Sequence, residues 1–394
     1  MIRVLVAHNR YQQRGGEDVV VESEINLLRS RGHEVKTYFR DNSSISSMPK
    51  SSVVKDTFWS SQTAKDLQRE IDVFHPDIIH VHNTFPLVSP SVFWAAAGAD
   101  CPIVQTLHNF RLLCLQAMFL RDGAPCEKCL GHSPWHGVVH RCYHNSMAQS
   151  AVVAGMISLH RHIGTHRKKV SRDIALTEFS QKKFIEGGVP GELIRVKPNF
   201  LDLPRSFPEV HRDGALFVGR LSHEKGIASL LAAIEEIPDF VLKVIGSGPL
   251  KDAVLAHPRV RYLGQLTRSD VLAEMRRSSF LVMNSLWYET FGLVLLEAFA
   301  SGLPVIAPAH GTVLEMTESG RLGVLFEPGS QKDLVRAITW AQSNPDKVNG
   351  MGKSARTDYL TKYTPEKNYS QLVEIYEEAI RDMEWYPNVK LQTH

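Results

Sequence analysis

The chain has 394 residues, of which 43% are hydrophobic and 22% are charged, and its formal net charge is +3. This length suits two domains of ordinary size, and the composition is that of a soluble globular protein. So small a net charge gives no reason to expect a nucleic acid partner. The sequence has no apolar run long enough to predict a membrane-spanning helix.

The start of the chain predicts a buried strand over residues 1–7, without the longer apolar region and cleavage site of a signal peptide. We therefore expect a cytoplasmic protein whose cysteines stay reduced unless a metal holds them. Gly15 and Gly16 follow, before a helical pattern over residues 19–31. The glycine pair permits close approach of a ligand to the backbone, although a plain tight turn explains it equally well. The three-glycine dinucleotide fingerprint is missing, which argues against a nicotinamide cofactor.

Short apolar runs then alternate with helical patterns over nearly the whole chain, which is typical of parallel βαβ units. A Ser-rich stretch, residues 42–63, shows no clear period and predicts a surface loop. Two predicted buried strands, residues 76–83 and 102–109, carry histidines near their ends, among them His82 and His108. Such strand ends are where loops build sites. A core histidine with a satisfied hydrogen bond is the alternative, and for His108 the residues alone favour it.

Four cysteines, Cys114, Cys126, Cys129 and Cys142, fall within 29 residues around one Cys-x-x-Cys pair. Four thiols with such a pair fit a tetrahedral structural zinc site. Reduced cysteines, or a redox pair at Cys126 and Cys129, are the alternatives. Cys101 is isolated in sequence and is expected in the core.

From Lys128 to Arg172 the chain has no Asp or Glu. Its basic residues there are Lys128, Arg141, Arg161, Arg167, Lys168, Lys169 and Arg172, and its histidines are His132, His136, His140, His144, His160, His162 and His166. Such a surface suits an anionic lipid interface or a pyrophosphate-bearing acceptor. A solvated basic face is the alternative, and the histidines are also candidate metal ligands.

The second half restarts after a polar linker, residues 202–213, with a predicted strand over residues 215–218. The loop after this strand carries Arg220 and Lys225. Two cations at the carboxyl end of a strand would neutralise a diphosphate.

Further on, two apolar runs, residues 280–283 and 304–307, predict strands joined by a loop and a short helix. Glu289 lies in the loop and Glu297 on the helix. The helix is expected to open near Gly292, which lets a ligand approach the backbone. The N–H groups of its first turn would form an anion site, contributed by Thr290, Phe291, Gly292 and Leu293. An ordinary amphipathic helix with two solvated glutamates is the alternative.

Glu289 and Glu297, eight positions apart around Phe-Gly, resemble the donor-site signature of retaining glycosyltransferases of family 4. The continuation Glu-Ala-Phe-Ala-Ser-Gly-Leu-Pro-Val from Glu297 fits the same family, and so do Gly-Arg-Leu at 219–221 and Glu-Lys-Gly at 224–226. The resemblance implies the α/β fold called GT-B, with two Rossmann-like domains whose parallel sheets face a cleft.

The domains that this resemblance implies are an acceptor-binding domain over residues 1–198, with a Cys-rich insertion at 114–142, and a nucleotide-sugar-binding domain over residues 199–364. A helix and tail over residues 365–394 would return to the first domain. The generic family does not require the four cysteines, so the possible structural zinc is a trait of this chain or of a subfamily.

The resemblance also implies roles for individual residues. Arg220, Lys225 and the helix N-terminus at 290–293 would hold the donor diphosphate, and Glu297 would bind the ribose. Glu289 would bind the donor sugar, as would His108 from the first domain. The loop around Gly16 would face the acceptor and the donor phosphates.

The implied function is transfer of a sugar, with retention, from a nucleotide-diphosphate sugar such as a UDP- or GDP-sugar. The acceptor would be a sugar or a lipid-linked precursor of bacterial polysaccharide assembly, reached from the inner face of a membrane. No Asp-x-Asp motif occurs, so no catalytic metal is expected. The alternatives are an epimerase or phosphorylase of the same fold, and a non-catalytic zinc-stapled protein that binds nucleic acid or membrane.

Overall fold

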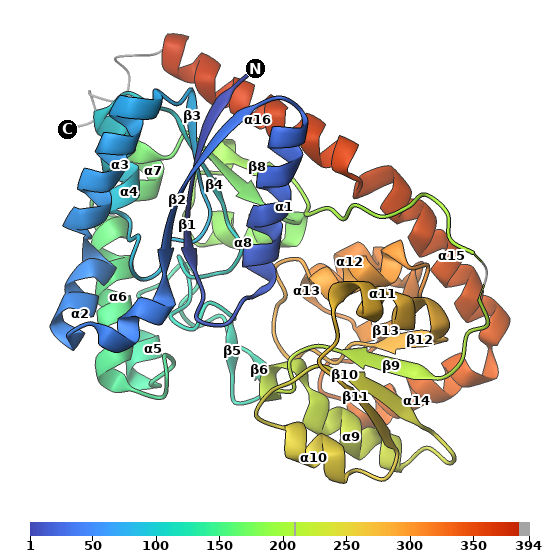
Figure 1. Cartoon of the computed structure of the whole chain (residues 1–394). Coiled ribbons are helices and arrows are strands. Elements are labelled where there is room, and N and C mark those ends of the chain that lie inside the picture. Colours follow the sequence, from blue (N-terminus) through green and yellow to red (C-terminus); the bar gives the residue numbers. More distant parts are fainter. Residues whose placement is uncertain (209, 386–394) are drawn as a thin grey trace. The chain divides into compact units, whose positions relative to one another are not determined.

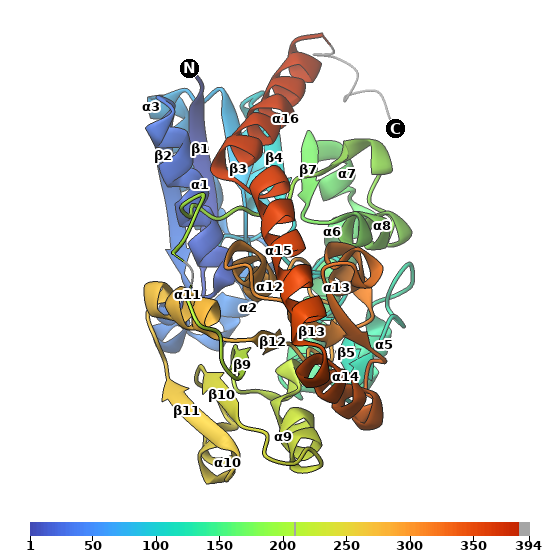
Figure 2. The ribbon, with the colours of Figure 1, turned by 90° about the vertical axis from the view of Figure 1, so that its right-hand side faces the viewer.

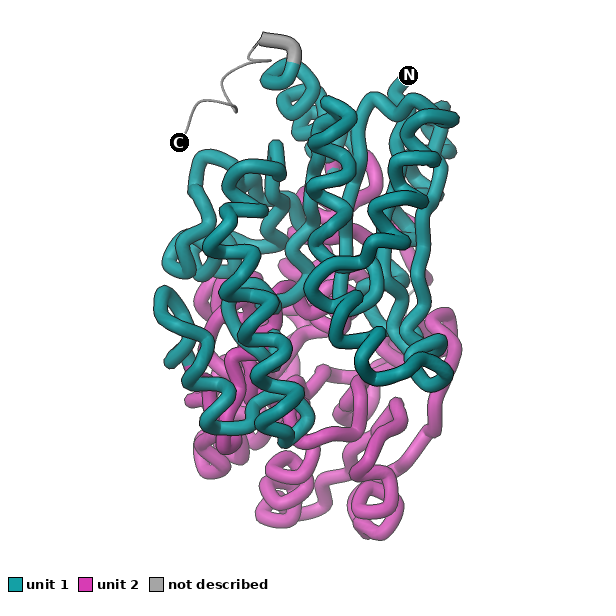
Figure 3. Tube along the Cα trace, turned by 90° about the vertical axis from the view of Figure 1, so that its left-hand side faces the viewer, with its two compact units in different colours: residues 1–117, 127–198, 368–394 teal, residues 118–126, 199–367 magenta. Residues whose placement is uncertain are grey.

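Two parallel sheets organise the chain, one in each of two compact units (Figures 1 and 3). This computed structural model describes residues 1–208 and 210–385. The first unit comprises residues 1–117, 127–198 and the chain from residue 368 onward, and the second comprises residues 118–126 and 199–367. The tail expected over residues 386–394 lies outside the described residues.

The sheet of the first unit has the strand order β2-β1-β3-β4-β7-β8. Its strands are β1 (Arg3–Arg10), β2 (Glu34–Asp41), β3 (Ile78–Val81), β4 (Ile103–Thr106), β7 (Arg172–Ala175) and β8 (Ile194–Val196). The helices before β4 are α1 (Gly16–Ser30), α2 (Lys50–Phe58), α3 (Ser61–Phe74) and α4 (Ser91–Gly98). Those after it are α5 (Trp135–Val139), α6 (Met147–His162), α7 (Thr165–Lys169) and α8 (Glu178–Glu186).

Successive residues of the central strand β1 point to opposite faces of this sheet. Val4 and Val6 pack in one cluster with side chains of α1 and of α16 (Pro365–Trp385), which cover one face (Figure 2). Leu5 and Ala7 pack with side chains of α3 and α4 on the other face. Strands that are buried on both faces are mostly apolar, and for this reason their runs are visible in the sequence.

The sheet of the second unit has the order β11-β10-β9-β12-β13-β14. Its strands are β9 (Ala215–Val218), β10 (Leu242–Ile245), β11 (Val260–Gly264), β12 (Phe280–Val282), β13 (Val305–Pro308) and β14 (Gly323–Phe326). Its helices are α9 (Ile227–Glu235), α10 (Lys251–Ala256), α11 (Arg268–Arg277), α12 (Leu293–Ala300), α13 (Gly311–Met316), α14 (Gln331–Ser343) and α15 (Pro345–Lys362). An antiparallel hairpin, β5 (Leu120–Arg121) and β6 (Ala124–Pro125), also belongs to this unit.

Both sheets are doubly wound, so each has a point where the strand order reverses. In the first sheet it lies between β1 and β3, and in the second between β9 and β12. Ligands of such sheets bind outside the carboxyl ends of the strands at this switch point. The loops that follow these four strands are therefore where a site is expected.

The prediction of a surface loop over residues 42–63 is wrong. The stretch holds a short 3-10 helix (Asn42–Ser47), α2 and the start of α3. Helix α2 has no strong apolar face, and its main inward contact is Phe58, which packs against side chains of α6. Among the described residues, no helix is long and apolar enough to cross a membrane.

Candidate active site

Lys225 and Glu289 meet at the switch point of the second sheet, in the loops after β9 and β12. Lys225 Nζ donates a hydrogen bond to Glu289 Oε1 at 2.5 Å. Ser285 Oγ donates to the same oxygen at 2.8 Å. The Lys225 ammonium also lies 5.1 Å from the centre of the Trp287 ring. Two of the predicted donor-site residues thus form one cluster.

Close backbone contact holds these two loops together. Gly226 has φ +66°, and a Cβ there would lie 2.0 Å from the Asn284 carbonyl oxygen. Asn284 Nδ2 donates to the Gly226 carbonyl at 2.8 Å and to Ser229 Oγ at 2.9 Å. The Leu286 N–H donates to the Glu224 carbonyl at 2.9 Å. Only glycine fits at position 226 without displacing the loop that carries Glu289.

The predicted anion site lies at the first turn of α12. Gly292, with φ 81°, precedes the first helical residue, Leu293. Phe291 is buried and packs edge-on against the Tyr363 ring. Thr290 is also buried, and its carbonyl accepts from Thr312 Oγ1 at 3.4 Å. The loop therefore has a fixed shape, and its N–H groups are those that a helix leaves without intrahelical partners.

Glu297 and Arg220 are two further residues predicted for the donor site. Glu297 follows this turn on α12, whereas Arg220 lies in the loop after β9. Glu297, on α12, has Oε1 3.3 Å from Nε of Arg268 on α11. Burial raises the pKa of Glu297, and Arg268 partly offsets this. Arg220 is exposed in the same loop as Lys225.

His310 also belongs to this cluster, and sequence reasoning missed it as a site residue. Its Nε2 lies 3.2 Å from the Ser285 carbonyl, and its ring centre lies 5.5 Å from that of Tyr288. Burial lowers the pKa of His310. A histidine two residues after the end of β13 is the signal that could have identified it.

A second polar cluster lies in the first unit, next to the carboxyl ends of β3 and β4, and includes His108. His82 Nδ1 lies 2.9 Å from His108 Nε2, and the two rings stack with centres 5.2 Å apart. On the other side, His82 Nε2 lies 3.7 Å from Glu24 Oε2. Glu24 Oε1 accepts a hydrogen bond from Lys197 Nζ, and Lys197 is completely buried. Sequence reasoning missed Glu24 and Lys197.

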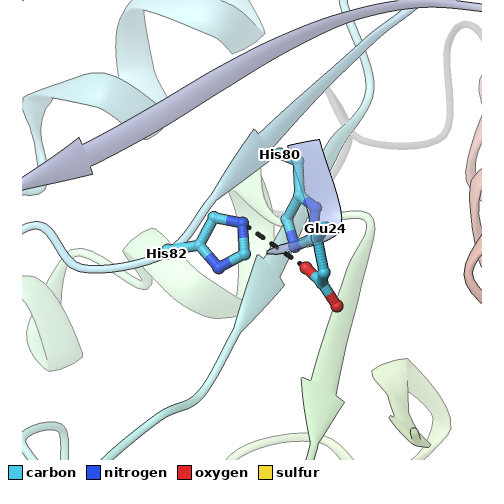
Figure 4. A group of neighbouring side chains, drawn as sticks. All are labelled: Glu24, His80 and His82. Atoms are coloured by element: carbon cyan, nitrogen blue, oxygen red, sulfur yellow. Dashed lines mark ion pairs between the residues drawn. The ribbon is translucent and has the colours of Figure 1, made fainter. Parts of the chain in front are cut away.

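Glu24, His80 and His82 form the group in the described part of the chain that has the ligand atoms for a metal ion (Figure 4). Burial lowers the pKa of His80 to about 4. Its Nδ1 lies 2.7 Å from the Tyr376 hydroxyl and its Nε2 2.8 Å from Thr106 Oγ1. Both ring nitrogens thus have hydroxyl partners already, and the ammonium of Lys197 already neutralises Glu24. The group therefore does not fit a cation.

Gly16, the remaining residue predicted for the donor phosphates, is the first residue of α1. The Gly15 N–H donates to Asp18 Oδ2 at 2.8 Å, and Asp18 Oδ1 lies 2.9 Å from His8 Nε2. Burial alone would raise the pKa of Asp18, but these hydrogen bonds outweigh it and the pKa falls. The glycine pair thus forms the capped start of α1. Through Asp18 it is linked to His8, whose ring centre lies 6.2 Å from that of His82.

None of the five cysteines forms a disulfide. Cys142 packs against apolar side chains of α5 and α6, and Cys129 Sγ lies 3.8 Å from the Pro134 carbonyl. Cys114 is buried. Of the four cysteines predicted to bind zinc, Cys126 belongs to the second unit and Cys114, Cys129 and Cys142 belong to the first. The zinc site stays a prediction.

The acid-free stretch is only partly a basic surface. Arg172 is buried and forms ion pairs with Glu378 and Asp382 of α16, so its predicted place on that surface is wrong. The exposed basic residues are Lys128, Arg141, Arg161, Arg167 and Lys168. Two large apolar side chains of α5 in the same stretch are also exposed, Trp135 by 50% and Val139 by 70%.

Two family models match the chain and together cover most of it. The model described as Glycosyltransferase Family 4 matches residues 14–205. The model described as Glycosyl transferases group 1 matches residues 207–358, which include the Lys225–Glu289 cluster.

Individual proteins agree with these models. The glycogen synthase of Mycobacterium tuberculosis is 26% identical over 72% of this chain and 64% of its own length, so the match spans less than two thirds of that relative. The phosphatidyl-myo-inositol mannosyltransferase of Mycobacterium leprae is 24% identical over 76% of this chain and 73% of its own. The HepE protein of Anabaena, solved in complex with UDP, shares the fold with a TM-score of 0.67 and 20% identity, over 95% of this chain and 99% of its own.

The two models, these relatives and the two parallel sheets lead to one conclusion. The chain belongs to family 4 of the glycosyltransferases and has the GT-B type of fold, with two Rossmann-like domains.

Proposed function

We propose that the protein transfers a glycosyl unit, with retention at the anomeric carbon, from a nucleoside diphosphate sugar to an acceptor hydroxyl. The observation that carries this proposal is the Lys225–Glu289 pair at the switch point of the second sheet, next to the first turn of α12. One cation, one carboxylate and a row of backbone N–H groups converge there. This is the set of groups that a sugar joined to a diphosphate requires.

In the proposed reaction, the bond between the anomeric carbon and the diphosphate oxygen breaks, and negative charge develops on that oxygen. Lys225, Arg220 and the N–H groups at the start of α12 stabilise this charge. The acceptor oxygen bonds to the anomeric carbon from the face that the diphosphate leaves. The acceptor proton passes to the departing diphosphate. Glu289 and His108 bind the donor sugar and Glu297 the ribose, and no side chain is assigned as a covalent nucleophile.

A UDP-sugar is the first candidate for the donor, because the Anabaena HepE protein binds UDP in its solved structure. A GDP-sugar is the second. The test is a thermal-shift screen with UDP-, GDP-, ADP- and dTDP-sugars, followed by product analysis with the donor that stabilises the protein most. We expect one nucleotide to be preferred and its free diphosphate to be released when an acceptor is present.

Three other outcomes would contradict transfer. Conversion of the donor into an isomeric nucleotide-sugar without acceptor would identify an epimerase. A reaction that requires inorganic phosphate would identify a phosphorylase. Failure of every nucleotide-sugar to bind would leave only a non-catalytic protein of this fold.

For the acceptor, we propose a lipid-linked precursor at the inner face of a membrane. It is supported by a set of exposed side chains on the segment from α5 to α7, namely the apolar Trp135 and Val139 and the basic Arg141, Arg167 and Lys168. We call this set the α5–α7 surface. Trp135 and Val139 are four positions apart on one helix and therefore share a face. Exposed aromatic and basic side chains in combination suit the headgroup region of an anionic bilayer.

We also propose a structural zinc ion held by Cys114, Cys126, Cys129 and Cys142. Four thiolates around one Cys-x-x-Cys pair are the donor set that structural zinc prefers. Elemental analysis of the purified protein should find about one zinc per chain, and a Cys129→Ser variant should lose it. A Cys101→Ser variant, which changes a buried cysteine outside the set, is the control. Zinc-free protein of normal stability would refute the proposal.

A further inference from the structure

A line of buried polar side chains runs from Lys197 through Glu24 and His82 to His108. It joins β8, α1 and the loops after β3 and β4 of the first unit. None of the four side chains is more than 8% exposed. Burying an ammonium and a carboxylate costs free energy, so a pair kept in the core calls for a reason beyond stability.

The charges on this line are balanced without any added ion. Lys197 donates to Glu24 Oε1, while Glu24 Oε2 is buried and, among the described residues, has no hydrogen-bond partner. His82 Nε2 lies 3.7 Å from this oxygen. One carboxylate oxygen of Glu24 therefore pairs with the ammonium of Lys197, and the other faces the imidazole of His82.

This arrangement determines where the imidazole protons sit. A neutral imidazole carries one N–H, so its two nitrogens take opposite roles. Burial, with a smaller effect of neighbouring groups, lowers the pKa of His82 and of His108 well below the usual value, so both rings are neutral at neutral pH. A carboxylate oxygen attracts an N–H and repels a lone pair, which places the proton of His82 on Nε2. His82 Nδ1 must then accept from His108 Nε2, 2.9 Å away.

We propose that Glu24, supported by Lys197, is a positioning residue that fixes the tautomer of His82 and, through it, that of His108. The proton of His108 is then on Nε2, and Nδ1 is the acceptor nitrogen. This rests on the proposed function, in which His108 binds the donor sugar: the tautomer decides which ring nitrogen of His108 donates a hydrogen bond and which accepts one. Groups that hold the tautomer of a working histidine are commonly as important as the histidine itself.

The surrounding groups are neutral or balanced. His80, whose ring centre lies 4.1 Å from that of His82, bonds to two hydroxyls. His8, whose ring centre lies 6.2 Å away, bonds to Asp18. Glu24 is therefore the carboxylate that faces the imidazole of His82.

The test replaces the charge pair as a whole, with Glu24→Leu and Lys197→Met together, so that no charge is left buried alone. Nitrogen-15 NMR of ring-labelled histidine in the unliganded protein reports the tautomer of His108. We expect a protonated Nε2 in the wild type and a loss of that preference in the double variant. For transfer from the preferred nucleotide-sugar, kcat should fall about 10- to 100-fold with little change in the donor KM.

The matched control is Tyr376→Phe, which removes a buried hydrogen bond from His80 and leaves the line from Lys197 to His108 intact. It should keep the His108 tautomer and most of kcat. A wild-type His108 protonated on Nδ1, or a double variant with an unchanged tautomer, would overturn the proposal. So would stoichiometric metal that the double variant loses.

The NMR result stands apart from the proposed function. If His108→Ala transfers sugar at the wild-type rate, the role assigned to His108 fails, and the tautomer measurement still decides whether Glu24 acts on His82. If the tautomer changes as expected but kcat does not, the positioning role is refuted while the transfer activity stands.

Discussion

At the scale of single residues, the cluster around Lys225 is an ion pair between its ammonium and the carboxylate of Glu289. Lys225 is a quarter exposed, whereas Glu289 is almost buried. A diphosphate entering this site would offer Lys225 a second anionic partner. The exposed position of Arg220 in the same loop suits a side chain that reaches a ligand.

We expect Lys225→Ala and Arg220→Ala each to lower kcat/KM for transfer by a factor of tens to hundreds. The physical reason is that one charge-assisted contact to a developing anion typically contributes about 2–4 kcal/mol. Steady-state kinetics with the preferred nucleotide-sugar measures the effect. Lys332→Ala, an exposed lysine of α14, is the control and should transfer normally. Wild-type rates in both site variants would mean that the donor binds elsewhere.

Asp173 on β7 allows a prediction about pH. Burial raises its pKa to about 8, and neither carboxyl oxygen has a hydrogen-bond partner among the described residues. Because the unfolded chain ionises this group near pH 4 while the folded chain does not, ionisation favours the unfolded state between about pH 4 and pH 8. The free energy of unfolding of the wild type should therefore receive a less favourable contribution from Asp173 as pH rises from about 4 to about 8.

Asp173→Asn removes that dependence. The free energy of unfolding of the variant, relative to the wild type, should rise by about 1.4 kcal/mol for each pH unit between pH 5 and pH 7. Urea denaturation at three pH values in this range measures it. Asp100→Asn, at an exposed position, should give a flat difference. A flat difference for Asp173→Asn as well would show that the carboxyl is ionised in the folded protein.

At the scale of elements, the predicted α/β fold with two parallel-sheet domains is confirmed. Its strands could be predicted because doubly buried strands are local apolar runs. The loops with Lys225 and Glu289 could be predicted because glycine, lysine and glutamate stand there at family-typical spacing. Helix α2 was missed because it has no apolar period.

The Glu24–Lys197 pair was missed for a different reason. Its members are 173 positions apart, and only the folded sheet brings them together. A local signal did exist for Glu24, which lies on the buried face of α1 among Val20, Val21, Leu27 and Leu28. A charged residue at an apolar position of an amphipathic helix is informative, but its partner cannot be read from the helix alone.

Gly226 gives a prediction for the loop after β9. Gly226→Ala would place a methyl group 2.0 Å from the Asn284 carbonyl, at a backbone conformation that favours glycine. The loops after β9 and β12 must then separate. If they bind the donor as proposed, we expect lost donor binding and a lower melting temperature. Gly188→Ala is the matched control, because φ there is +91° and a Cβ would meet nothing within 4 Å. Donor affinity equal to that of the control would show that the loop contact does not shape the site.

At the scale of the whole molecule, charge is unevenly distributed along the chain. The net charge is only +3, yet the stretch from Lys128 to Arg172 contains no acidic residue. The structure places Arg172 in an internal ion-pair network and keeps His160 and His166 mostly inside, which leaves a smaller basic area than the sequence indicated. What remains exposed includes the α5–α7 surface, with its basic side chains Arg141, Arg167 and Lys168 and its apolar side chains Trp135 and Val139.

We expect the protein to bind vesicles that contain anionic lipid at low salt, and to release them as salt rises. Each basic residue near such a bilayer contributes about 1 kcal/mol, and salt screens the attraction. Arg167→Glu with Lys168→Glu should weaken binding by at least about 30-fold, since two attractions become repulsions. Lys169 is left unchanged because its ammonium packs over the Trp94 ring. Co-sedimentation measures the effect.

The charge-matched control is Lys332→Glu with Lys347→Glu, two exposed lysines of the second unit. This control has the same net charge as the variant with Arg167→Glu and Lys168→Glu, but its two changes lie on the other unit. It should bind vesicles like the wild type, because its α5–α7 surface is unchanged. Trp135→Ser should weaken binding at high salt as well, since its contribution is apolar. Nucleotide-sugar binding should be the same in all three variants. A wild type that ignores anionic vesicles at low salt, and glycosylates only acceptors in solution, would identify this surface as an ordinary hydrated face.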